Sequence, residues 1–127
     1  MYCKFLKIKI SKLLYMEYQF SGKHYIASFK ELEYKSNRFI IEVIKHALTS
    51  CNINILSFQE YYFENNAMTC SWLLSESHCS IHTYPEYKSM FIDCFTCGSK
   101  IDMIKFHNIL VEFLKPVNPD YQIINRN

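Results

Sequence analysis

The chain has 127 residues, half of them hydrophobic and 17% aromatic, and its 14 basic and 12 acidic side chains give a net charge of +2. This length and apolar content predict one domain with its own core, and a charge so small and dispersed argues against a nucleic-acid surface. No apolar run approaches the length of a membrane span and no signal peptide is convincing, so we expect the six cysteines to be free thiols in the cytoplasm.

Residues 1–15 are expected to be an N-terminal extension, either an edge strand or a tail. Their apolar runs are interrupted by four lysines, at positions 4, 7, 9 and 12. The single domain is therefore expected over residues 16–127.

The first half of this domain combines a strand, a helix and two further strands. Residues 24–29 alternate in polarity and predict a strand. Ser36 can cap a helix that runs to about Thr49. The apolar stripe of this helix comprises Phe39, Ile40, Val43, Ile44 and Leu48. Residues 53–63 and 68–74 are rich in β-branched and aromatic residues and predict two more strands.

The second half is expected to contain a hairpin, a helix and a last strand. Residues 78–84 and 90–97 predict the hairpin. The helix is expected to begin after Ser99 as N-cap and to stop at Pro116. Its apolar stripe is read as Ile101, Ile104, Ile109, Leu110, Phe113 and Leu114. Residues 121–125 predict the last strand.

The element order β-α-β-β-β-β-α-β with short connections predicts an α+β fold. We expect a two-layer α/β sandwich, with a mostly antiparallel sheet that carries both helices on one face. The other face, lined by aromatic residues, is expected to meet a second copy of the chain, so a homodimer is predicted.

The predicted hairpin concentrates reactive side chains. Strand alternation places His82 on one face, and Ser77, five positions earlier, reaches that face only if a break or bulge lies near it. A turn over residues 85–89 would place Tyr84 opposite Met90. The same register would place Cys97 opposite Ser77.

These residues resemble a known family. The spacing of Glu76-Ser77-His78, Ile81-His82-Thr83, Pro85-Glu86 and Phe95-Thr96-Cys97-Gly98 is similar to that of the bacterial and archaeal pyruvoyl-dependent S-adenosylmethionine decarboxylases. The resemblance implies self-cleavage between Glu76 and Ser77, which converts Ser77 into a covalent pyruvoyl cofactor. It also implies decarboxylation of S-adenosylmethionine through a Schiff base, for spermidine and polyamine biosynthesis.

The resemblance also assigns roles to single residues. His82 would act in the elimination step of processing, and Thr69, where serine is usual in the family, would stabilise the oxyanion. Cys97 would protonate the substrate after carbon dioxide leaves. Phe63 and Tyr84 would sandwich the adenine, and Glu86 would bind the ribose hydroxyls, with Tyr84 standing where the family usually has tryptophan.

Two alternatives remain open at this stage. A pyruvoyl-dependent arginine or ornithine decarboxylase would keep the cofactor and change the substrate. An uncleaved, non-catalytic relative would act as a partner protein. Cys94 and Cys97 form a Cys-x-x-Cys motif, but a second cysteine pair is missing and alternation separates the two thiols, so no metal site is expected.

Overall fold

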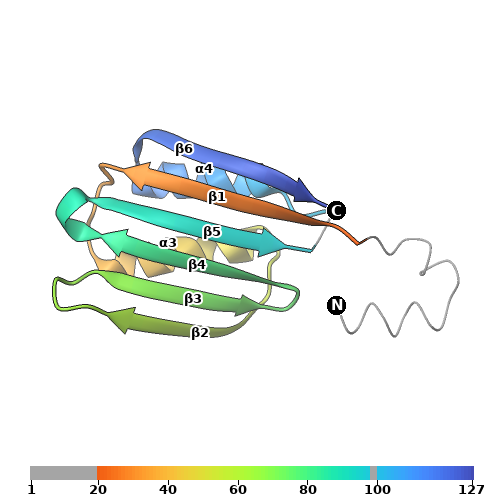
Figure 1. Ribbon diagram of the computed structural model, residues 1–127, viewed down its shortest axis with the longest axis horizontal. Helices are drawn as coiled ribbons and strands as arrows, with labels where there is room; N and C mark the ends of the chain where they lie inside the picture. Colours follow the sequence, from red (N-terminus) through yellow and green to blue (C-terminus); the bar gives the residue numbers. More distant parts are fainter. Residues whose placement is uncertain (1–19, 98–99) are drawn as a thin grey trace, which may run out of the picture.

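Stretches rich in β-branched and aromatic residues form six strands of one sheet in the computed structural model, which describes residues 20–97 and 100–127 (Figure 1). The strands are β1 (Gly22–Lys30), β2 (Ile55–Tyr62), β3 (Met68–Leu74), β4 (Ser77–Tyr84), β5 (Ser89–Thr96) and β6 (Val117–Arg126). Residues 1–15, for which a strand or tail was expected, lie outside the described residues.

The strand order across the sheet is β2-β3-β4-β5-β1-β6, and every neighbouring pair is antiparallel. The first strand of the described residues, β1, thus lies between β5 and β6. Both helices lie behind the same face of the sheet in Figure 1. The predicted α+β sandwich with helices on one face is confirmed. The last strand is longer than the predicted 121–125.

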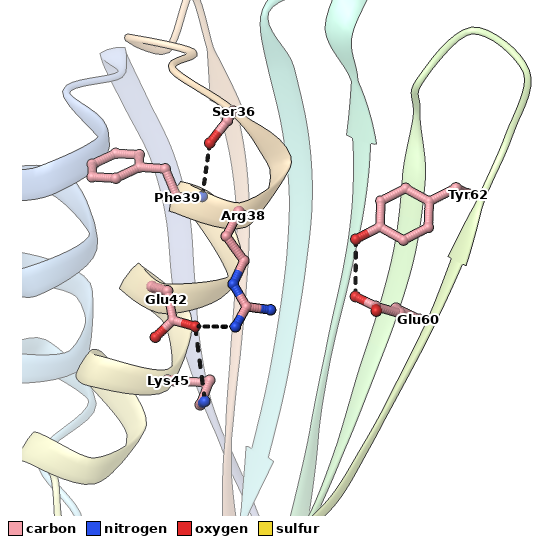
Figure 2. A network of polar contacts seen from close by, with 7 residues as sticks. All are labelled: Ser36, Arg38, Phe39, Glu42, Lys45, Glu60 and Tyr62. Carbon is pink, nitrogen blue, oxygen red and sulfur yellow. Dashed lines mark hydrogen bonds and ion pairs between the residues drawn. The ribbon is translucent and has the colours of Figure 1, made fainter.

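The first helix, α3 (Asn37–Ser50), forms as the sequence predicts. The Ser36 hydroxyl accepts a hydrogen bond of 3.0 Å from the Phe39 N–H, which caps the helix (Figure 2). Four members of its predicted stripe are buried and Phe39 is partly buried, so this helix packs as expected.

The second helix, α4 (Met103–Leu114), begins later than predicted. Its N-cap is Asp102, whose carboxylate accepts from the N–H groups of residues 104 and 105 at 3.1 and 3.0 Å. The predicted cap, Ser99, lies outside the described residues. Its buried residues are Met103, Phe106, His107, Leu110 and Leu114. Of the predicted stripe, Ile101 and Ile109 are partly buried, and Ile104 and Phe113 are exposed.

The sheet face toward the helices carries the core. Alternate residues of β1, β3, β4 and β5 are buried there, and the largest include Tyr25, Phe29 and Trp72, each 0% exposed. Within the described part of the chain, no helix is long and apolar enough to cross a membrane.

The opposite face of the sheet has no helix over it, and we call it the open face. Strand pairing sets its side chains in three rows that cross β3, β4, β5, β1 and β6. The His82 row is Thr69, His82, Phe91, Ser28 and Asp120. The Ser80 row is Ser71, Ser80, Asp93, Ile26 and Gln122. The Phe95 row is Leu73, His78, Phe95, His24 and Ile124.

Candidate functional site

Two residues of the predicted processing machinery touch each other on the open face. Thr69 on β3 pairs with His82 on β4, and the Thr69 Oγ1 lies 2.7 Å from the His82 Nδ1. This hydrogen bond fixes the plane of the imidazole and leaves its Nε2 for a second partner. The pair therefore combines a hydroxyl group with an imidazole that can act as a base.

Aromatic rings surround this pair. The His82 ring lies 5.7 Å from Phe63 and 4.7 Å from Tyr84, measured between centroids, and Tyr84 lies 5.6 Å from Phe91. The two residues expected to sandwich an adenine thus flank His82 within one copy of the chain. A flat ligand that stacks on either ring would lie beside the imidazole.

Glu86 lies at the same end of the sheet. It belongs to a short 3-10 turn, η1 (Pro85–Tyr87), and its Oε2 accepts a long hydrogen bond of 3.4 Å from the Asn65 side chain. This contact joins the β4–β5 turn to the β2–β3 turn. Phe63, Tyr84 and Glu86 are therefore gathered at one end of the sheet.

Ser77 lies toward the opposite end of β4. It is the first residue of the strand, follows the turn at Ser75 and Glu76, and pairs with Leu74. Pairing between β3 and β4 continues without a register shift to His82, so the predicted bulge near Ser77 is wrong in this uncut chain. Five residues of regular strand separate Ser77 from His82 by about 17 Å and place their side chains on opposite faces.

The predicted hairpin register is wrong by one residue. Tyr84 pairs with Ser89, not with Met90, because the connection contains four residues and Lys88 turns the chain with a left-handed φ of 48°. Continued by one step, this register places Thr96 opposite Ser77. Cys97 follows directly after β5 and is partly buried as a free thiol.

A depression on the open face connects much of this chemistry. A cavity of about 480 Å³ is lined by Thr69, Ser80, His82, Phe91 and Asp93, among others. A second cavity, of about 760 Å³, continues past Phe91 to Tyr84 and Tyr87. Such volumes suit small organic ligands.

A polar cluster that the sequence reasoning did not single out lies on the open face across the Ser80 and Phe95 rows. The His24 Nε2 lies 2.5 Å from the Asp93 Oδ1, and the Arg126 Nη1 lies 3.4 Å from the His24 Nδ1. Arg126 also lies over the Phe95 ring at 5.2 Å, and the same ring stacks with His78. One sequence signal pointed toward this cluster. The alternation along residues 24–29 places His24 on the side of the strand opposite Tyr25.

The two cysteines of the Cys-x-x-Cys motif differ in burial. Cys94 is buried on the helix side, where it is paired across the strands with Cys79. The hydrogen bond with Cys94 and burial raise the pKa of the Cys79 thiol. Among the residues the structure describes, no group of three or more metal-ligating side chains is present.

Fold and site together define a two-layer α/β protein with an open, antiparallel sheet that bears a threonine–histidine pair. The family model for S-adenosylmethionine decarboxylase matches residues 23–127. The chain is 35% identical over 104 residues to S-adenosylmethionine decarboxylase proenzyme 2 of Bacillus cereus strain ZK / E33L, covering 80% of this chain and 85% of that protein. It is 36% identical over 104 residues to the S-adenosylmethionine decarboxylase proenzyme of Brevibacillus brevis, covering 80% of this chain and 78% of that protein.

A solved structure agrees with these matches. The crystal structure of the adenosylmethionine decarboxylase from Aquifex aeolicus superposes with a TM-score of 0.74 at 27% identity, covering 84% of this chain and 90% of that one. The chain belongs to the S-adenosylmethionine decarboxylase family.

Proposed function

We propose that this chain is the proenzyme of a pyruvoyl-dependent S-adenosylmethionine decarboxylase that acts in polyamine biosynthesis in the cytoplasm. Family membership supports this substrate, because the curated relatives carry the name of the proenzyme. The observation that carries the processing chemistry is the 2.7 Å contact between Thr69 and His82. It joins two residues from different strands that the resemblance had assigned to one reaction.

Processing would use the chain's own atoms. The Ser77 hydroxyl attacks the Glu76 carbonyl carbon, and the peptide bond becomes an ester through an oxyanion that the Thr69 hydroxyl stabilises. His82 then removes the α-hydrogen of residue 77, and the ester leaves as the Glu76 carboxylate. Water hydrolyses the remaining dehydroalanine end to a pyruvoyl group and ammonia.

In the decarboxylation, the pyruvoyl group would supply an electron-accepting carbonyl that can bind the substrate amine. Cys97 would donate a proton to the carbon that loses carbon dioxide. Phe63 and Tyr84 would stack on the adenine, and Glu86 would accept hydrogen bonds from the ribose hydroxyls.

A complete site would need two copies of the chain. Ser77 and Cys97 lie at one end of the hairpin, whereas His82 and its aromatic neighbours lie toward the other. A separation of about 17 Å along a regular strand prevents proton transfer within one copy. We therefore propose a homodimer in which each site takes Ser77 and Cys97 from one copy and Thr69 and His82 from the other.

Such a dimer follows from a two-fold axis that lies between two open faces and crosses the strands at right angles. This axis reverses the strand direction, so the Ser77 end of one β4 lies over the His82 end of the other. The open face also exposes apolar side chains that a partner would cover, including Leu73 at 55% and Phe91 at 53% exposure. After cleavage, residue 77 is a chain end, and strand alternation no longer fixes its side.

Intact mass and carbon dioxide release test the function. We expect two fragments, residues 1–76 and a pyruvoyl-blocked 77–127, together with carbon dioxide from S-adenosylmethionine. Ser77→Ala should remain one chain. A wild-type chain that stays uncut would refute the processing, and release from arginine or ornithine alone would refute the substrate.

Mixed dimers test the shared site. Ser77→Ala and His82→Ala should each stay uncut when expressed alone. When they are expressed together, the His82→Ala copy should be cut, because the Ser77→Ala copy supplies its His82. If no cleavage occurs in the purified mixed dimer, the two groups do not act across copies.

A further inference from the structure

The open-face cluster around Arg126 lies at the same end of the sheet as Ser77 and Cys97. Arg126 ends β6 and pairs with Gly22, the first residue of β1. Its side chain reaches back over β1 to the ring of Phe95 on β5, only two residues before Cys97. The guanidinium therefore lies over the end of β5, the strand that Cys97 directly follows.

The position of the Phe95 ring depends on Gly22. A Cβ atom at residue 22 would lie 2.4 Å from the Phe95 Cζ, so the ring occupies space that any other residue would fill. His24 contacts the same ring edge to face, with centroids 5.8 Å apart. The Phe95 ring thus forms an apolar surface beneath the guanidinium, which we call the apolar floor.

One long hydrogen bond joins Arg126 to His24, which is itself bonded to Asp93. An arginine can only donate, so Nη1 donates to the His24 Nδ1 and the His24 Nε2–H donates to Asp93. Asp93 thereby orients His24, and His24 orients Arg126. Within the described chain, Arg126 makes no ion pair with a carboxylate, which leaves most of its five N–H groups for a ligand.

We propose that Arg126 binds the α-carboxylate of the substrate, an inference that rests on the proposed decarboxylase function. A guanidinium binds a carboxylate through two parallel hydrogen bonds, and the apolar floor strengthens that interaction. The carboxylate is attached to the same carbon that Cys97 would protonate, so the two groups must lie near each other. Because the product lacks this carboxylate, it loses the contact with Arg126 and can leave the site.

The test compares two ligands that differ only in the carboxylate. For the processed Arg126→Gln enzyme, we expect the KM for S-adenosylmethionine to rise about ten- to hundredfold, with a smaller change in kcat. The inhibition constant of decarboxylated S-adenosylmethionine should change less than about threefold. Arg126→Lys should be intermediate, because it keeps the charge and loses the paired geometry.

Arg38→Gln is the matched control, since Arg38 pairs with Glu42 at 3.3 Å on the outer face of α3 (Figure 2). It should leave both constants unchanged. The unfolding temperature with saturating product reports separately on whether the Arg126→Gln site is intact, and we expect the same ligand-induced rise as in the wild type.

Each result decides between specific roles. If the affinity for both ligands falls equally, or the product no longer stabilises the variant, Arg126 has a structural role and the inference is wrong. If the wild type decarboxylates S-adenosylmethionine and Arg126→Gln keeps its KM, the inference is also wrong while the proposed function stands. A wild type that cannot decarboxylate the substrate would overturn both.

Discussion

The two faces of the sheet use similar residues for different purposes. On the helix-covered face, Cys79 and Cys94 are 0% exposed and contact each other, and His107 is buried against Tyr25. His82 on the open face and Cys97 just after β5 are partly accessible, and His82 forms one hydrogen bond, with Thr69. Burial removes the reactivity of a thiol or imidazole, so the location of each residue, more than its type, indicates its role.

The largest expected effect comes from the cysteines. Cys97→Ala should self-cleave yet lose most multiple-turnover activity, because the carbanion is no longer protonated at the correct carbon. Cys94→Ala, on the covered face, should keep its activity per folded molecule. The rate of steady-state carbon dioxide release from both purified variants measures this difference. Full turnover by Cys97→Ala would show that Cys97 is no more necessary for catalysis than the buried Cys94.

Packing provides the next comparison. Trp72 is 0% exposed on the covered side of β3, and Trp72→Ala should lower the free energy of unfolding by about 3–5 kcal/mol. Its neighbour Ser71 is exposed on the open face, and Ser71→Ala should change stability by about 0.5 kcal/mol or less. Urea titration measures both. Similar losses for the two variants would mean that the open face is packed as tightly as the covered one.

A smaller effect is expected for substitution of Thr69, which should change the rate of self-cleavage. Thr69→Val removes the hydroxyl that contacts His82 and should slow self-cleavage about hundredfold. Thr69→Ser keeps the hydroxyl and should process at a rate near that of the wild type. The time course of fragment formation by intact mass separates the two variants. Equal rates for both would remove Thr69 from the oxyanion role.

The smallest effect is a dependence of stability on pH that arises on the covered face. Burial lowers the pKa of His107, whose Nδ1 lies 2.7 Å from the Tyr25 hydroxyl and whose ring stacks on Tyr121 at 3.6 Å. The unfolded chain therefore takes up the proton first, so stability should be complete above about pH 6.5 and decline as the pH falls through the lowered pKa.

Unfolding free energies at pH 7.5 and 5.5 measure this decline. His107→Asn can still bond to Tyr25 and does not titrate, so it should flatten the profile in this range. A wild-type profile with the same slope as that variant would assign the pH dependence to other groups.

The strands and α3 could be predicted because their signals are local. Alternation and the Ser36 cap are contained within a few residues. The start of α4 was wrong because Ser99 and Asp102 are both good N-caps, and only packing against the sheet decides which apolar stripe is buried. The hairpin register was wrong because Lys88 takes a positive φ without the glycine or asparagine that would mark such a turn.

The site depends on contacts between distant parts of the chain. Thr69 and His82 were connected in advance only by resemblance to a family, and their contact requires the pairing of β3 with β4. Arg126 meets His24 across 102 residues, because β1 is inserted between β5 and β6. Local patterns carry no information about that insertion.

The insertion of β1 also has a consequence for the proposed cleavage between Glu76 and Ser77. The earlier piece contributes β1, β2 and β3, and the later piece contributes β4, β5 and β6, so the two pieces alternate across the sheet. Separating them requires the β3–β4, β5–β1 and β1–β6 ladders to open together. The nicked protein should therefore persist as two peptides held together by these three ladders, and its reassembly from denaturant should become second order in concentration.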